Sequence, residues 1–262
     1  MSPTQQQAPD SVGPWARLPA VGGSLVIADL HLDAEGGPLA ERFGAWTRSL
    51  RVPRLVILGD LFDSWVGPKQ RRIEGTRQVL QALSALVEGG TELHVVPGNR
   101  DFWMGSDFEA ATGGKVHAKG LVIEGQQGAS LLVHGDELCT LDLGYQRYQR
   151  WIQSRPLRLL QSLPLPVLRW LARRLRSRSE YSVPRKPEAS KRMQPEAAAA
   201  FLERAEAQTL ICGHAHRYQD EDLSKGRRWL VLDAWGDARD CLEEGPGGWR
   251  SLGSDGAAAN PE

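Results

Sequence analysis

Five short apolar runs of this chain end in Asp, Asn or His, in most cases beside a glycine. The runs read SLVIADLH, RLVILGD, ELHVVPGNRD, SLLVHGD and QTLICGHAH. Continuous apolar runs of this length are typical of β-strands that are buried on both faces. In α/β sheets, the loops beyond the carboxyl ends of the strands gather at one edge. The pattern therefore predicts that polar residues from Asp29 to His216 meet at one site.

Amphipathic patterns separate the first three runs, with apolar residues at spacings of three, four or seven positions. The two stripes are Leu39, Phe43, Trp46 and Leu50, and Ile73, Leu80, Leu83 and Val87. Each stripe predicts a helix with one buried face. The resulting β-α-β-α-β order indicates the α/β class, and the later runs RRWLVLDAW and GGWRSLG predict strands that complete the sheet.

The length of 262 residues, 41% of them hydrophobic, allows one large domain. We expect this domain to span residues 21–254, with an insertion at about 145–192. Residues 1–20 and 255–262 are expected to be a disordered arm and tail. The three cysteines (Cys139, Cys212 and Cys241) are too scattered for a disulfide framework and should be free buried thiols. The start lacks a secretory signal and no stretch is long enough to span a membrane, so we expect a cytoplasmic protein.

The chain has equal numbers of acidic and basic residues, but the charge is unevenly distributed. Residues 147–192 contain 13 Lys or Arg against two acidic residues. The stretch WIQSRPLRLLQSLPLPVLRWLARRLRSRS within it mixes leucines and arginines, a composition typical of elements that lie on membrane surfaces. It predicts an anionic partner such as a lipid surface. The alternative is that the leucines only pack this segment against the domain. Leucines in place of stacking aromatic residues argue against a nucleic acid partner.

Each polar motif is a weak indicator when taken alone. GDLFD can be a turn with a capping carboxylate, and the two histidines of GHAH can sit in a turn. Four of the six histidines nevertheless follow the predicted strands, whereas His94 and His117 do not and are interpreted as structural. Together, the carboxylate, imidazole and amide donors suit two ions of Mn²⁺, Fe²⁺ or Zn²⁺. Two such ions about 3.5 to 4 Å apart clamp a phosphoryl group and activate a bridging water.

The order of the motifs (D-X-H, GD-X-X-D, GN-R-D, H and GH-X-H) resembles the calcineurin-like metallophosphoesterase family. The resemblance implies a dinuclear metal-dependent hydrolase. It also implies a β-sandwich flanked by helices in four layers (αββα), with an inserted helical cap.

The family pattern implies a role for each matching residue. One metal ion would be held by Asp29, His31 and His216, and the other by Asn99, His134 and His214, with Asp60 bridging both. Both ions are expected to be Mn²⁺. Arg100 stands where most members carry His, and Asn99 and Arg100 are the expected catalytic residues.

Four stretches (GNRDF, LGDLFDSWVG, HGDELCTLDLGYQRYQ and LVLDAWGD) are similar to the branch of the family that hydrolyses UDP-2,3-diacylglucosamine in lipid A biosynthesis. This implies that the products are UMP and 2,3-diacylglucosamine 1-phosphate, that the cap encloses acyl chains, and that the protein is peripheral on the cytoplasmic face of the inner membrane. The implied substrate contacts are Arg100, Asp142, Arg176, Ser179 and Lys186. Arg suits a pyrophosphate because it is always charged and binds phosphate oxygens in pairs.

Several positions depart from the pattern of that branch. Val183 and Pro184 stand where an Asn is expected, and the other departures are Leu141 for Asp, Asp63 for Glu and Ala215 for Thr. They leave open a different substrate, either another nucleotide diphosphate or a phosphodiester. No obligate protein partner is evident. All the expected ligands lie outside residues 149–178, so we expect the cap to be separable from the chemistry.

Overall fold

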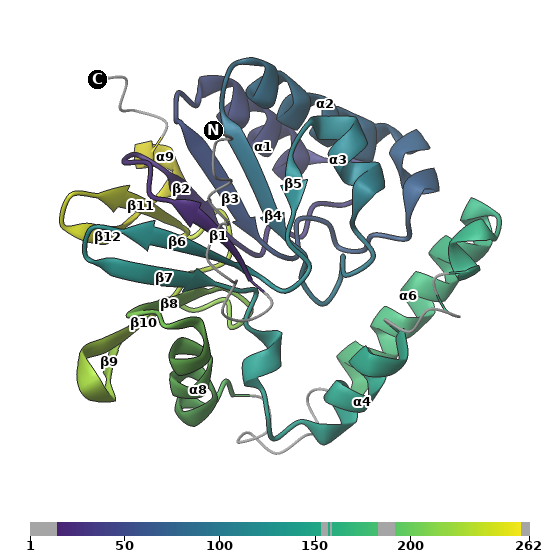
Figure 1. Ribbon diagram of the computed structural model, residues 1–262. Coiled ribbons are helices and arrows are strands. Elements are labelled where there is room, and N and C mark those ends of the chain that lie inside the picture. The colour runs from purple at the N-terminus through teal and green to yellow at the C-terminus, as the bar shows by residue number, and fades with distance from the viewer. Residues whose placement is uncertain (1–14, 153–156, 158, 183–191, 258–262) are drawn as a thin grey trace, which may run out of the picture.

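The computed structural model describes residues 15–152, 157, 159–182 and 192–257. Within these residues, the strands form two six-stranded mixed sheets that face each other (Figure 1). The first sheet contains, in spatial order, β1 (Ala16–Pro19), β6 (Leu121–Gly125), β7 (Gly128–Leu132), β8 (Thr209–Cys212), β10 (Arg227–Val231) and β9 (Gln219–Leu223). The second contains β12 (Gly248–Leu252), β11 (Cys241–Gly245), β2 (Leu25–Ile27), β3 (Arg54–Leu58), β4 (Glu92–Val96) and β5 (Lys115–Val116).

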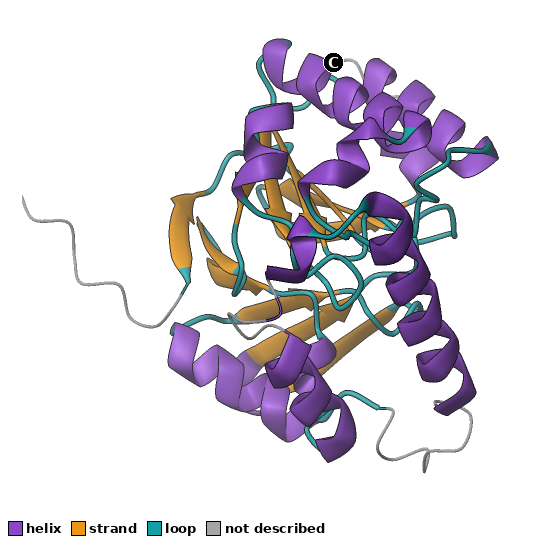
Figure 2. Cartoon of the chain, turned by 90° about the vertical axis from the view of Figure 1, so that its right-hand side faces the viewer, coloured by secondary structure: helices purple, strands orange, loops and turns teal. Residues whose placement is uncertain are grey.

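Helices cover the outer faces of both sheets (Figure 2). The second sheet packs against α1 (Pro38–Ser49), α2 (Glu74–Glu88) and α3 (Ser106–Thr112), and the first against α8 (Pro195–Ala205). Shorter elements are η1 (Pro68–Arg72), η2 (Asp136–Leu138), η3 (Leu159–Ser162), η5 (Ser224–Gly226) and α9 (Ser254–Ala257). The predicted αββα layering is confirmed. The cap helices α4 (Leu143–Ile152) and α6 (Leu165–Ser182) stand beside the sandwich, next to the loops that follow the strands (Figure 1).

Burial on both faces explains the continuous apolar runs. In β3, Leu55 and Ile57 pack under the helices, whereas Val56 and Leu58 face the other sheet. Successive side chains of a strand point to opposite faces, so a strand between a helical layer and a second sheet has no polar face. The five runs form β2, β3, β4, β7 and β8, as expected.

The structure corrects three details. Leu39 is 37% exposed, because the buried stripe of α1 runs through Ala40, Phe43 and Trp46 and leaves Leu39 at its margin. The predicted arm is too long, since residues 16–19 form β1, which pairs in parallel with β6, and Trp15 before it is buried. The predicted tail begins too early, because α9 extends to Ala257. Residues 1–14 and 258–262 lie outside the described part of the chain.

Two further expectations concern the cysteines and membrane spans. Cys139, Cys212 and Cys241 are buried and do not form disulfides, as predicted. In the part of the chain that the structure describes, none of the helices has the length and hydropathy that a membrane crossing requires.

Candidate metal centre

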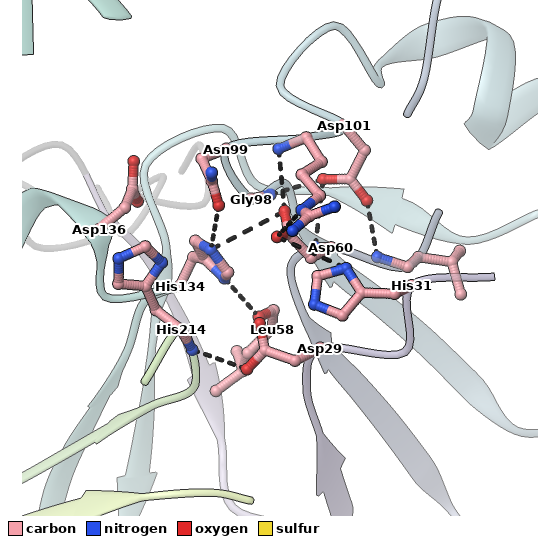
Figure 3. A network of polar contacts seen from close by, with 12 residues as sticks. Asp29, His31, Leu58, Asp60, Gly98, Asn99, Asp101, His134, Asp136 and His214 are labelled. Carbon is pink, nitrogen blue, oxygen red and sulfur yellow. Dashed lines mark hydrogen bonds and ion pairs between the residues drawn. The ribbon is translucent and has the colours of Figure 1, made fainter. Parts of the chain in front are cut away.

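The polar residues that end the five runs come together in space (Figure 3). Asp29 and His31 follow β2, Asp60 follows β3, and Asn99 and Arg100 follow β4. From the other sheet come His134, after β7, and His214 and His216, after β8. The loops at the carboxyl ends of these strands gather at one edge of the sandwich, as predicted, although they belong to two sheets instead of one.

The histidines form two pairs. Nε2 of His31 lies 3.0 Å from Nε2 of His216, and the rings of His134 and His214 have centroids 5.1 Å apart. The backbone turns after Gly213, so the two histidines of GHAH serve different pairs. The family pattern assigns these two pairs to different ions.

Asp29 and Asp60 lie between the histidine pairs. One oxygen of Asp60 is 3.9 Å from Nδ1 of His31, and its other oxygen is 3.8 Å from Nε2 of His134. Oδ1 of Asp29 is 3.5 Å from Nε2 of His216. Two sets, Asp29 with His31 and His216, and Asp29 with Asp60 and His134, each bring their ligand atoms within 4.8 Å of one another. Ligand atoms at this spacing can bind one metal ion in each set, with Asp29 common to both sets.

Strained backbone is concentrated at these residues. In the described part of the chain, seven residues other than glycine have positive φ, and five of them belong to the centre: Asp29, His31, Asp60, His214 and His216. A left-handed conformation of a non-glycine residue costs about 1–3 kcal/mol and persists where the surroundings enforce it. In these backbone conformations the side chains point inward, toward the centre, from loops that turn sharply at the ends of their strands.

The glycines of the motifs make room for these side chains. A Cβ atom on Gly59 would lie less than 3.0 Å from the ring of His134, one on Gly98 would meet Asp60, and one on Gly213 would meet Asp29. Glycine is therefore required before the Asp, Asn and His of GD, GN and GH because the chain passes directly against another of the predicted ligands.

The electrostatics favour bound cations. Burial opposes protonation of His134, but the carboxylates of Asp60, Asp29 and Asp136 outweigh it and raise its pKa to about 10. Burial and the charge of Arg100 lower the pKa of His31 to about 3. Among the described residues, Oδ1 of Asp29 and Nδ1 of His31 are buried without a hydrogen-bond partner. Buried polar atoms are normally paired, so these orphaned atoms fit metal ligands.

The tautomer of His134 also fits. Its Nδ1 lies 2.9 Å from the carbonyl oxygen of Leu58, an acceptor, and this contact holds the proton on Nδ1. Its Nε2 lies 3.1 Å from Oδ1 of Asn99. An imidazole nitrogen and an amide oxygen this close together can serve as two ligands of one ion.

Asp101 is a functional residue that the sequence-based site omitted. Its carboxylate is fully buried and accepts hydrogen bonds from the backbone N–H groups of Gly98 (2.6 Å), Leu61 (2.8 Å) and Asp60 (3.3 Å). It therefore clamps the loop after β3 to the loop after β4. The available signal was its place as the last letter of GNRD.

Comparison with known proteins decides the family. The sequence profile described as Calcineurin-like phosphoesterase matches residues 24–218. This chain belongs to the calcineurin-like phosphoesterase family. Among its relatives, a UDP-2,3-diacylglucosamine hydrolase of Stutzerimonas stutzeri is 36% identical over 218 residues, 80% of this chain and 90% of the relative. Another of that name from Ralstonia nicotianae is 35% identical over 224 residues, 81% of this chain and 84% of the relative. The crystal structure of zinc-bound Vps29 from Entamoeba histolytica matches with a TM-score of 0.40 and 16% identity, covering 84% of each chain.

Arg100 of this phosphoesterase lies at the edge of the centre. Its Nε is 3.4 Å from Asp60, and its Nη1 is 3.3 Å from Asp63. Its side chain is 31% exposed, so N–H groups not used by these carboxylates can meet a ligand. Asp63, noted above as a departure, thus holds the guanidinium in place.

The expected cap contacts are less complete. Asp142 caps α4 by accepting a hydrogen bond from the N–H of Tyr145 at 2.9 Å. Arg176 and Ser179 lie on α6, but their side chains fall outside the described residues, as do Val183, Pro184 and Lys186.

His94 and His117 contact each other, Nδ1 to Nε2, at 2.9 Å, and belong to neither ligand set, in keeping with a structural role.

Proposed function

We propose that this chain hydrolyses the pyrophosphate bond of UDP-2,3-diacylglucosamine, giving UMP and 2,3-diacylglucosamine 1-phosphate. The observation that carries the proposal is the placement of Asp60 between two histidine pairs, with the guanidinium of Arg100 at its side. The names of the two relatives supply the substrate.

The proposed ligands are Asp29, His31 and His216 for one ion, and Asn99, His134 and His214 for the other, with Asp60 shared. The 3.8 and 3.9 Å contacts of the two Asp60 oxygens support a shared carboxylate. Nitrogen and oxygen donors without thiolates support Mn²⁺. When bound, two divalent ions polarise a phosphoryl group and lower the pKa of a water molecule.

Arg100 is the proposed contact for the pyrophosphate. Its charge is permanent, so it stabilises the negative charge that develops on phosphoryl oxygens but cannot act as a general acid. A phosphate leaving group needs no proton, unlike an alcohol. Asp63 and Asp60 restrict the guanidinium to one position, which reduces the entropy lost on binding.

The cap is the proposed surface for lipid. Leu143 is 62% exposed, Trp151 56%, Val167 44% and Trp170 60%, and all four lie on α4 or α6. Arginines accompany them, with Arg174 stacked over the ring of Trp170. Apolar side chains that are interspersed with cations suit acyl chains and anionic head groups. We therefore propose peripheral association with the cytoplasmic face of the inner membrane.

The test is hydrolysis by metal-depleted protein to which Mn²⁺ is restored. The substrates are UDP-2,3-diacylglucosamine, UDP-N-acetylglucosamine and bis(p-nitrophenyl) phosphate, with UMP or nitrophenol release as the readout. We expect Mn²⁺-dependent release of UMP from the diacylated substrate at a far higher kcat/KM than from the others. Equal or faster hydrolysis of an unacylated substrate would favour the second candidate, a phosphoesterase for water-soluble substrates.

A further inference from the structure

The cap contacts four of the loops that carry the proposed ligands. These contacts are Glu35 with Arg169, Lys69 with the carbonyl of Leu163 (2.6 Å), the indole N–H of Trp103 with the carbonyl of Ile152 (3.2 Å), and Asp136 with Tyr145 and Gln149. In these contacts, Glu35, Lys69, Trp103 and Asp136 lie in the loops after β2, β3, β4 and β7, respectively. Each of these loops therefore has its own attachment to the insertion.

The attachment through Asp136 is the most buried of the four. Asp136 is only 3% exposed. Its Oδ2 accepts hydrogen bonds from the hydroxyl of Tyr145 at 2.5 Å and from Nε2 of Gln149 at 2.6 Å. Tyr145 and Gln149 are four residues apart and therefore share one face of α4. Two hydrogen bonds to one carboxylate determine both the position and the rotation of this helix.

Asp136 also lies against the metal centre. It follows His134 by two residues, across Gly135 with a φ of 117°, and Figure 3 shows it beside the rings of His134 and His214. A Cβ atom on Gly135 would approach Cys212 at 3.2 Å, so this turn is packed against the end of β8. Displacement of Asp136 would therefore displace the loop that carries His134.

We propose that Asp136 is a positioning residue that fastens α4 to the His134 and His214 side of the centre, so that metal binding and the placement of α4 depend on each other. The proposal rests on the metal centre proposed above. Coupling between two sites is reciprocal: if ordered α4 favours the metal-binding geometry, bound metal must favour ordered α4. Because α4 carries Leu143 and Trp151, the same contact would orient part of the lipid surface relative to the reacting phosphate.

The test is hydrogen–deuterium exchange of the α4 amides, in full-length protein with and without Mn²⁺ and without substrate. Three proteins are compared: the parent, the double variant Tyr145→Phe with Gln149→Leu, and the control Tyr148→Phe, which changes another tyrosine of α4 that does not contact Asp136. We expect Mn²⁺ to slow exchange of α4 in the parent and the control. In the double variant this protection should fall roughly tenfold, and the affinity for Mn²⁺ should fall with it.

Kinetics give a second readout. The single variant Tyr145→Phe should raise the KM for the diacylated substrate by a larger factor than it lowers the kcat for bis(p-nitrophenyl) phosphate. This variant replaces the double variant if the double variant does not fold. Equal protection of α4 by Mn²⁺ in parent and double variant would overturn the proposal. So would Mn²⁺ binding to the parent without protection of α4, which would leave the metal centre itself standing. Failure of the parent to bind Mn²⁺ would overturn both.

Discussion

Asp101 offers a quantitative test, because its carboxylate joins two loops that carry proposed ligands and is not itself a proposed ligand. In Asp101→Ala, three buried N–H groups (those of Gly98, Asp60 and Leu61) lose their acceptor. A buried unsatisfied donor costs about 1–3 kcal/mol, so the free energy of unfolding should fall by about 3 kcal/mol or more. In Asp101→Asn one oxygen remains for Gly98 and Asp60, while the amide nitrogen faces the N–H of Leu61. The loss should then be about 1–3 kcal/mol.

The same substitutions should weaken metal binding. Asp60 and Asn99 lie directly beside the backbone groups that Asp101 binds. Substitution of a residue that orients metal ligands typically lowers the affinity for the metal by about 10- to 100-fold. The assays are urea unfolding of the metal-depleted protein and calorimetric titration with Mn²⁺. The matched control is Asp240→Asn, since Asp240 is also fully buried and accepts backbone N–H bonds at 2.6 Å from Gly236 and Ser254. Both variants should lose stability, but only Asp101→Asn should lose Mn²⁺ affinity. Parent-like affinity in Asp101→Asn, or equal losses in both, would refute the clamp.

Four further predictions follow from other contacts. Asp60→Ala should abolish turnover and lower the Mn²⁺ content measured by mass spectrometry, and near-normal activity would remove the shared-carboxylate assignment. Arg100→Ala should lower kcat/KM about 10²- to 10³-fold with metal content unchanged, and full rescue by Arg100→His would mean that this position transfers a proton. The double substitution of Trp151 and Trp170 by Ser should weaken sedimentation with phosphatidylglycerol vesicles, and the idea fails if binding is unchanged. Burial and the charge of His117 lower the pKa of His94 to about 4 from 6.5, so the unfolded chain takes up a proton first as pH falls through this range. The free energy of unfolding should therefore decrease below pH 6.5, and less steeply in His94→Gln, as urea titrations at each pH can show.

Much of the centre was predictable from the sequence because its determinants are local. A strand covered on both faces must be apolar throughout, so β2, β3, β4, β7 and β8 were recognisable as runs. Gly59, Gly98 and Gly213 mark the places where the chain passes against a predicted ligand, and that steric requirement appears directly in GD, GN and GH. The separation of His214 from His216 also follows from the turn after Gly213.

Other features depend on partners distant in the sequence. β9 reads QDEDL and has no apolar alternation; it is a strand because β10 offers it hydrogen bonds along an exposed edge. β1 likewise exists through its pairing with β6, more than a hundred residues later. The division of the strands between two sheets is set by which apolar faces fit together in the layer between them, a property of the whole set of side chains.

The contacts around the ligands were decided in the same way. A carboxylate such as Asp101 or Asp136 has no local signature for the group it will bond, because its donors come from another loop or from the cap. The sequence therefore determined which residues could be ligands and where the chain must turn. The tertiary structure decided which histidines meet, which carboxylate clamps their loops, and how the cap is attached to them, because these hydrogen bonds exist only after distant segments have packed.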